Sequence, residues 1–214
     1  MKEIKETTAQ YEKTALEAYK QVSALILKMT ALSLPNEYAQ GFDLTVSNPL
    51  AQLFSYLMQE NLIEIGLADG DFTINERLFV EHFALQSGTS ILELFSNVRK
   101  GRAFTWDEFF TLNGSQMTQI TDLVKIGLNP IAQAFFGTFA LADSHSETKD
   151  YYHGFIEGLT TIVNSYLSID LARTGIENQR ALDVISDNIL KPLDEAYQNV
   201  VEVAKESDMV DRRA

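Results

Sequence analysis

The chain has 214 residues, of which 45% are hydrophobic and 22% charged, a composition typical of a folded globular protein and not of a disordered one. Its formal net charge of −13 disfavours binding to nucleic acids, because an acidic surface repels phosphate backbones. The absence of cysteine excludes disulfides, zinc–thiolate sites and cysteine nucleophiles.

The first predicted element is an amphipathic helix over residues 3–32, where apolar residues recur at three- and four-residue steps. Residues 33–36 end this helix, and the stretch from there to Pro49 has no clean period, so we expect a linker. We therefore predict three parts: an N-terminal amphipathic helix with its linker over 1–48, a helical domain over 49–206 and a polar tail over 207–214.

Further apolar runs at helical spacing predict seven more helices and no strand. These helices cover residues 49–67, 74–87, 91–100, 106–112, 116–142, 146–171 and 175–206. The most apolar stretch, 126–142, contains Asn129, Pro130 and Gln133, which favours a buried central helix over a membrane span. Pro130 and Pro192 are expected to kink or interrupt their helices.

Five of the predicted helix starts carry a capping box, a Ser or Thr followed three residues later by Glu. The hydroxyl accepts a hydrogen bond from the third backbone amide of the helix, and the carboxylate accepts one from the amide of the capping residue. The five pairs are Thr73/Glu76, Ser90/Glu93, Thr105/Glu108, Ser144/Glu147 and Thr174/Glu177. Thr14 and Glu17 have the same spacing but lie within the periodic N-terminal helix, so we interpret them as marking no helix start.

The pattern D-x3-T-x2-E occurs twice, at Asp69–Glu76 and at Asp170–Glu177. When the two copies are aligned, apolar residues of the preceding predicted helices also align. The aligned pairs are Phe54 with Phe155, Met58 with Leu159, Leu62 with Val163 and Ile65 with Tyr166. Each copy therefore predicts a helix, an acidic turn and a capped helix. The fold class that follows is an all-α multi-helix bundle built from two related helical hairpins, with an extra N-terminal helix.

Three carboxylates lie close together in the first acidic turn, those of Asp69, Asp71 and Glu76. Hard cations such as calcium bind where several oxygen ligands converge, so this turn is a candidate metal site. An EF-hand does not fit, because aligning Gly70 with the loop glycine puts apolar residues at two ligand positions. The alternative is structural: Glu76 closes a capping box, and the aspartates lie near the positive end of a helix. We favour the structural interpretation.

The first acidic turn also resembles a family signature. Residues 68–71, Ala-Asp-Gly-Asp, follow an apolar helix and precede Glu76 and a second apolar helix, which is similar to the signature of the TerB-like domain, named for tellurite-resistance proteins. The resemblance covers roughly residues 50–190. It implies an all-helical fold of two related hairpin units.

The TerB-like resemblance also implies a ligand set, because members of the family are suspected of binding metal through acidic residues of these turns. Carried over to this chain, it points to Asp69, Asp71 and Glu76, and more weakly to Asp170 and Glu177. The second turn departs from the family pattern, since it lacks the Asp-Gly pair and contains a basic residue, Arg173.

The sequence contains no G-x-S-x-G motif and no phosphate-binding glycine loop, so we expect no enzymatic activity. The leading hypothesis is a non-enzymatic TerB-like helical module that binds other proteins, related to stress responses. The alternative is a divalent-metal-binding or sensing domain that uses the acidic turn 69–76, and no other cofactor is expected. We expect an unidentified protein partner, no nucleic-acid partner and no membrane span. The charged first residues lack a signal-type apolar core, which favours a cytoplasmic location.

Overall fold

A computed structural model describes residues 2–33, 49–68, 70, 72–98, 104–145, 151–169 and 175–211 of the chain. Over these ranges the protein is an all-α multi-helix bundle without strands, as predicted. The helices are α1 (Lys2–Ser33), α3 (Pro49–Leu67), α4 (Ile74–Ser87), α5 (Leu92–Val98), α6 (Trp106–Phe110), α7 (Gly114–His145), α8 (Tyr151–Leu167), α9 (Gly175–Ile185), the π-helix η1 (Ser186–Leu190) and α10 (Lys191–Asp211).

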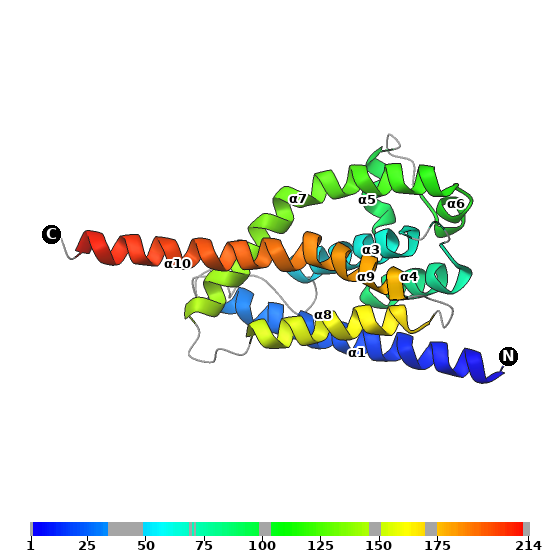
Figure 1. The fold of residues 1–214 in the computed structure, drawn as a ribbon, viewed down its shortest axis with the longest axis horizontal. Coiled ribbons are helices and arrows are strands. Elements are labelled where there is room, and N and C mark those ends of the chain that lie inside the picture. Colours follow the sequence, from blue (N-terminus) through cyan, green and yellow to red (C-terminus); the bar gives the residue numbers. More distant parts are fainter. Residues whose placement is uncertain are drawn as a thin grey trace.

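Helix α3 lies at the centre of the bundle. Helices α1 and α8 pack side by side on one side of it, and α7 passes on the opposite side (Figure 1). Helix α4 packs against both α3 and α1, α9 packs against α3, and α10 packs against α7 before it extends beyond the bundle (Figure 1). Most of α3 is therefore covered by other helices.

The expectation of a buried central helix at 126–142 is wrong. Ile126 is 67% exposed and Ile131 is 54% exposed, while Phe135 and Phe136 of the same helix are buried. Helix α7 therefore covers the bundle with one face only. Exposed apolar residues are common on folded proteins, so the apolar composition of this stretch does not by itself indicate that the whole helix is buried.

Two of the predicted capping boxes, those at Thr73 and Thr105, are confirmed with both of their hydrogen bonds. A further reciprocal cap of the same geometry begins α7. The Asn113 side chain accepts the Gln116 amide at 3.0 Å, and the Gln116 side chain accepts the Asn113 amide at 3.1 Å. An Asn at the cap can replace Ser or Thr because its side-chain oxygen reaches the same amide.

The prediction that Ser144 caps a helix start is wrong. Helix α7 continues to His145, and the Ser144 hydroxyl donates to the Leu141 carbonyl at 2.7 Å within that helix. At α5, the Ser90 hydroxyl accepts the Leu92 amide at 3.3 Å, whereas the Glu93 amide donates to the Ser90 backbone carbonyl. Thr174 lies outside the described residues.

The interpretation of Thr14 is confirmed, because this residue lies inside α1 and its hydroxyl donates to the Gln10 carbonyl. Serine and threonine hydroxyls can bond the carbonyl one turn earlier in a helix, so a capping pattern alone does not establish a helix start.

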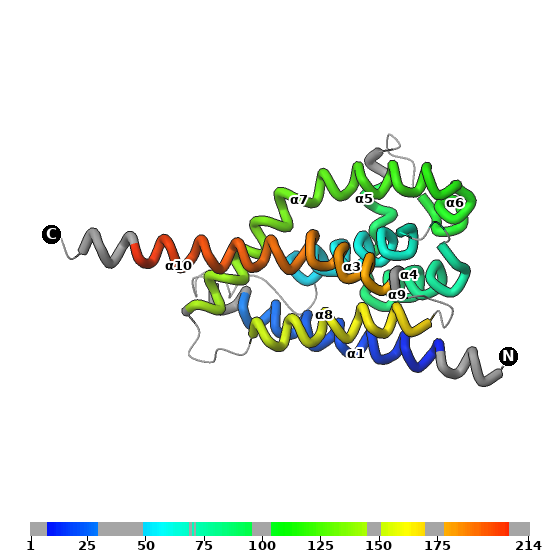
Figure 2. The backbone as a smooth tube through the Cα atoms, in the orientation of Figure 1, coloured from blue at the N-terminus to red at the C-terminus, as the bar shows by residue number. Residues whose placement is uncertain are grey.

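The two helical prolines act differently. Helix α7 stays continuous across Pro130, although it bends along its length (Figure 1). Before Pro192 the chain forms the π-helix η1, in which the Lys191 amide bonds the Ser186 carbonyl five residues earlier. Because proline has no amide hydrogen, it cannot bond the carbonyl of Asn188, and a wider turn accommodates that loss. Helices α9 and α10 continue along one line across η1 (Figure 2).

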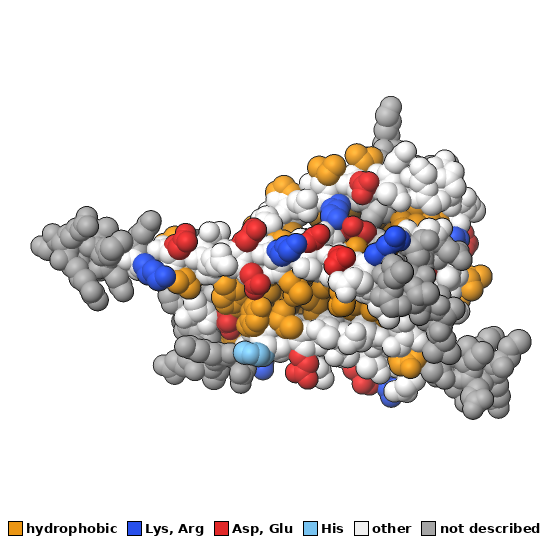
Figure 3. All heavy atoms as spheres, in the orientation of Figure 1, with side chains coloured by type: hydrophobic (Ala, Val, Ile, Leu, Met, Phe, Trp, Pro, Cys, Tyr) orange, Lys and Arg blue, Asp and Glu red, His pale blue; other side chains and the backbone are white. Residues whose placement is uncertain are grey.

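One hydrophobic cluster joins all of the long helices, α1 included. Val22 and Ile26 of α1 are buried in it, and α1 approaches α8 closely at Gly154 and Gly158. A Cβ atom at position 158 would lie 2.2 Å from Val22 Cγ2, so only glycine permits this approach. Hydrophobic side chains reach the surface between α8 and α10 (Figure 3).

Buried polar side chains of α3 connect it to the segment that joins α4 and α5. Gln59 donates to the Thr89 carbonyl at 3.1 Å and accepts the Ile91 amide at 2.9 Å. The hydroxyl of Ser55 is bonded to those of Ser87 and Thr89. These bonds give hydrogen-bond partners to polar groups of the α4–α5 segment that would otherwise be buried without them.

No helix in the described part of the chain combines the length and the apolar character that a membrane span requires.

Candidate functional site

The capping box of α4 engages the Glu76 carboxylate of the first acidic turn. Glu76 is fully buried, and its Oε2 atom accepts hydrogen bonds from the Thr73 backbone amide at 2.8 Å and from the Thr73 hydroxyl at 2.9 Å. Glu76 therefore closes the capping box of α4, as the structural interpretation of the turn predicts. Asp69 and Asp71 lie outside the described residues, so metal binding by these two residues stays a prediction.

Two arginines bond the backbone on either side of the first acidic turn. Arg180 of α9 donates to the Ala68 carbonyl at 2.8 Å, and Arg77 of α4 donates to the Phe72 carbonyl at 2.8 Å. Gly70 lies between these contacts with a φ of 87°, a conformation that favours glycine. The arginines place positive charge beside the turn, which reduces its attraction for a further cation.

The second acidic turn, over 170–174, lies outside the described residues, as does the side chain of Glu177. The helices before the two turns can be compared. All four aligned pairs of apolar residues are buried, and the rings of one pair, Phe54 and Phe155, pack at 5.4 Å from each other. The two units differ after their turns. In the first unit α4 packs on the helix that precedes it, α3, whereas in the second unit α9 packs more closely on α3 than on the helix that precedes it, α8.

In the ranges that the structure describes, no group of three or more His, Asp or Glu side chains is arranged to hold a metal ion. Because Glu76 serves as the capping carboxylate of α4 and two arginines lie beside the turn, titration of the full chain with calcium, magnesium or manganese is expected to give no saturable heat signal in calorimetry. Only the weak screening of a protein with a net charge of −13 should be seen. Asp71→Asn is the matched variant and should respond as the parent does. A saturable signal that Asp71→Asn abolishes would show that the turn binds metal.

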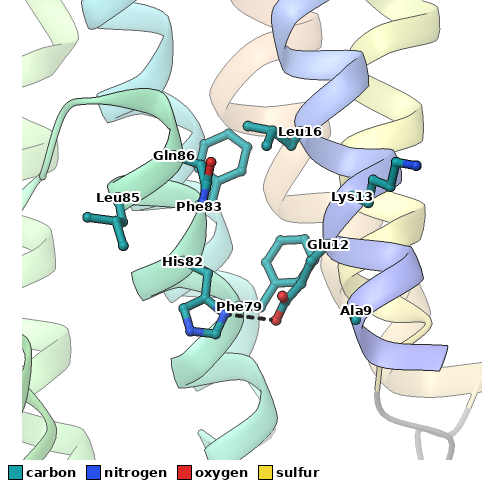
Figure 4. Close-up of a pocket in the computed structure, with 9 residues that line it drawn as sticks. All are labelled: Ala9, Glu12, Lys13, Leu16, Phe79, His82, Phe83, Leu85 and Gln86. Carbon is teal, nitrogen blue, oxygen red and sulfur yellow. Dashed lines mark hydrogen bonds and ion pairs between the residues drawn. The ribbon is translucent and has the colours of Figure 1, made fainter. Parts of the chain in front are cut away.

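A groove of about 430 Å3 runs between α1 and α4 (Figure 4). Its apolar lining comes from Leu16 of α1 and from the Phe79 and Phe83 rings of α4, which lie between the two helices. The complete lining is Ala9, Glu12, Lys13, Leu16, Phe79, His82, Phe83, Leu85 and Gln86. On both helices these residues recur at three- and four-residue steps, which is why the groove follows the helix axes.

One polar contact crosses the groove. His82 Nδ1 of α4 lies 3.2 Å from Glu12 Oε1 of α1, as Figure 4 shows. The contact is an ion pair when the imidazole is protonated, and its side chains are 48% and 25% exposed. A pair with this exposure contributes little to stability, and a ligand in the groove can replace it at small cost.

A second candidate site lies where α3, α7 and η1 meet. We call it the Glu60 cluster, and its members are Glu60, Asn61 and Glu64 of α3, Lys125 of α7 and Asn188 of η1. Asn188 donates to Asn61 Oδ1 at 3.0 Å and to Glu64 Oε2 at 2.9 Å. Lys125 Nζ also donates to Glu64 Oε2, at 2.7 Å. These bonds join side chains from three elements that are distant in the sequence.

Glu60 is the most deeply buried carboxyl group of the Glu60 cluster, with 2% of its surface exposed. Burial raises its pKa to about 8, and the nearby carboxylate of Glu64 adds to the increase, while Lys125 opposes it. The cause is the cost of holding a charge away from water. Glu60 therefore carries a proton over most of the neutral range.

A third polar contact ties α8 and α10 to the end of α7. The Tyr197 hydroxyl donates to Asp143 Oδ2 at 2.7 Å, and the Tyr152 hydroxyl donates to Asp194 at 3.1 Å. The two tyrosine rings pack edge to face at 5.2 Å. Burial, followed by the bond to Asp143, raises the pKa of Tyr197, so its hydroxyl remains a donor. This arrangement is suited to holding helices together.

Comparison of the chain with models of protein families, with curated proteins and with solved structures gives no match.

The sequence patterns described above predict neither the α1/α4 groove nor the Glu60 cluster. A local signal exists for the cluster, since Gln59, Glu60 and Asn61 are three consecutive polar residues inside a mainly apolar helix. Polar residues on every face of a buried helix must find partners inside the protein. The groove has no comparable signal, because its two walls are separate helices.

Proposed function

We propose that this chain is a non-enzymatic, TerB-like helical module that binds a protein partner, and that the α1/α4 groove receives an amphipathic helix of that partner. The observation that carries the proposal is the groove itself, whose apolar floor is formed by the half-buried Leu16 and by the buried rings of Phe79 and Phe83. Apolar grooves between helices are a common binding site for the apolar face of an amphipathic helix.

The shape of the groove favours a helix as the ligand. Both walls are helices whose lining residues recur at three- and four-residue steps, so side chains at the same steps on a third helix can pack between them. The exposed edge also suits an interface, because Leu85 at the rim is 74% exposed. A partner helix would cover this side chain.

The charge of the chain favours a basic partner. With a net charge of −13, the protein attracts positively charged molecules and repels acidic ones at a distance. Glu12 at the groove can pair with a lysine or arginine of the ligand once its contact with His82 opens. The proposed ligand is therefore a helix with one apolar face and basic flanks.

The groove can be tested with a photo-reactive amino acid at Gln86, which is exposed and lines the groove. The protein that crosslinks from this position is then produced, and its affinity for the full chain is measured by calorimetry. Gln86→Arg puts bulk and positive charge into the groove. We expect this substitution to weaken binding by about tenfold or more, which is the effect of losing one well-packed contact.

Gln133 is the matched control, because it is an exposed glutamine on α7, away from the groove. Photo-crosslinking from Gln133 should not give the same product, and Gln133→Arg should bind as the parent does. If the two arginine variants bind the isolated partner equally well, the groove is not its binding site.

A further inference from the structure

One oxygen atom of the Glu60 cluster has no partner. Glu60 Oε2 accepts a hydrogen bond from Asn61 at 3.1 Å, but Glu60 Oε1 has no donor within hydrogen-bond distance among the described residues. A buried carboxylate oxygen without a donor is costly, and native proteins rarely retain one without a reason. The surroundings of Glu60 supply that reason.

The carboxyl group of Glu64 is one cause of the raised pKa of Glu60, through its charge and through a hydrogen bond between the two groups. They lie one helical turn apart on α3, which places both on the same face. Two ionised carboxylates at such a distance repel each other, whereas a protonated carboxyl group donates to its neighbour. Glu60 can therefore satisfy both of its oxygens only when it holds a proton.

The charged groups around Glu60 do not remove this requirement. Lys125 of α7 is the cation that faces it, but its Nζ bonds Glu64, and Asp122 of the same helix adds negative charge. Asn188, which faces the cluster from η1, is neutral. On either side of Asn188, Asp187 and Lys191 pair with each other. Three charged groups of the other neighbouring helices are engaged elsewhere: Arg180 of α9 bonds Ala68, Arg77 of α4 bonds Phe72 and Phe110, and Glu12 of α1 pairs with His82 of α4.

The same contacts connect Glu60 to an irregular helical turn. Asn188 lies in η1, and its side chain donates two hydrogen bonds to α3, one to Asn61 and one to Glu64. π-Helical turns interrupt the regular hydrogen-bond ladder and are frequent at functional positions. A charge change at Glu64 or Glu60 therefore acts directly on the point where α9 meets α10.

We propose that the Glu60 cluster is a proton-operated latch that holds η1 against α3. With its proton, Glu60 donates to Glu64, and Glu64 accepts in turn from Asn188, so that η1 stays bound to α3. When Glu60 releases its proton to solvent, the two carboxylates repel each other, and η1 separates from α3 together with the adjoining ends of α9 and α10. Protonation of Glu60 is therefore the event that controls the contact between η1 and α3.

The direction of the pH effect follows from the pKa of Glu60, which is about 8 with η1 bound and falls toward the ordinary value of 4.5 as water reaches the opened cluster. Below pH 4.5 both states hold the proton, so the latch contributes fully. Between these values only the closed state holds it, and the opening constant rises by up to about tenfold per pH unit. Above pH 8 neither state holds it, and the dependence on pH ends.

Carbon-13 NMR of the full chain with labelled glutamate side chains tests the latch directly. One glutamate carboxyl resonance is expected to titrate near pH 8 and to be absent from Glu60→Gln. Hydrogen exchange of the η1 amides, corrected for intrinsic rates, should show the opening constant rising with pH through the same range. In Glu60→Gln that rise should disappear, because a glutamine is neutral and can still donate to Glu64.

Glu195→Gln is the matched control, since Glu195 is exposed on α10 and the same change of charge occurs there outside the cluster. It should keep the pH dependence of the parent. The proposal is overturned if every glutamate of the parent titrates below about pH 6, near its ordinary range. It is also overturned if Glu60 titrates near pH 8 while the opening of η1 does not follow. The titration of the parent needs no variant to fold.

Discussion

Phe155→Ala is expected to lower the free energy of unfolding by about 3–5 kcal/mol, because it removes a fully buried ring and leaves a cavity. The Phe155 ring centroid lies 4.9 Å from that of Phe139, 5.4 Å from that of Phe54 and 6.3 Å from that of Phe135. This one side chain therefore joins α8 to both α3 and α7. Urea unfolding followed by circular dichroism measures the loss.

Ile126→Ala is the control for Phe155→Ala. It also shortens an apolar side chain of a long helix, but Ile126 is 67% exposed, so its effect should stay within about 0.5 kcal/mol. Similar unfolding midpoints for the two variants would mean that Phe155 does not lie in the core as described.

Gly158→Ala is the second substitution with a large expected effect. The new Cβ would lie 2.2 Å from Val22 Cγ2, and valine cannot move away easily because its side chain is short and restricted at χ1. Helices α1 and α8 must then separate, at an expected cost of about 1–3 kcal/mol in the free energy of unfolding. Thermal and urea unfolding of the full chain measure this cost.

The double variant Gly158→Ala with Val22→Ala tests the cause, because it removes the group that the new Cβ meets. The double variant should lose less free energy of unfolding than the sum of the losses in the two single variants, as expected for residues in contact. Gly127→Ala in α7 is the opposite control. No heavy atom lies within 4 Å of a Cβ there, so the substitution should stabilise the helix by about 0.5–1 kcal/mol. Equal destabilisation by both alanines would contradict the close α1/α8 contact.

Local patterns predicted the helices of this protein well. The predicted bounds of 49–67 and 74–87 agree with α3 and α4, and the capping boxes at Thr73 and Thr105 form as expected. These features depend on contacts within a few residues of one another, so nearby residues suffice to determine them. The same local geometry makes the use of Glu76 as a capping carboxylate predictable.

Local patterns failed where one motif serves two structures. Ser144 and Glu147 have the spacing of a helix start, yet Ser144 bonds within the last turn of α7. A serine hydroxyl can accept from an amide ahead of it or donate to a carbonyl behind it. The length of the preceding helix decides between the two, and that length depends on how far the packed face of α7 extends.

The sequence by itself determined the fold class, the positions of most helices and the four aligned pairs of buried residues in the two repeated units. Only the tertiary structure decided that α3 and not α7 is the central helix, that α1 and α4 enclose a groove, and that Glu60 meets Asn188. Hydrophobic periodicity tells which face of a helix is buried, because that is a property of the helix alone. It does not tell which helix covers that face, since the choice depends on the packing of side chains from distant segments.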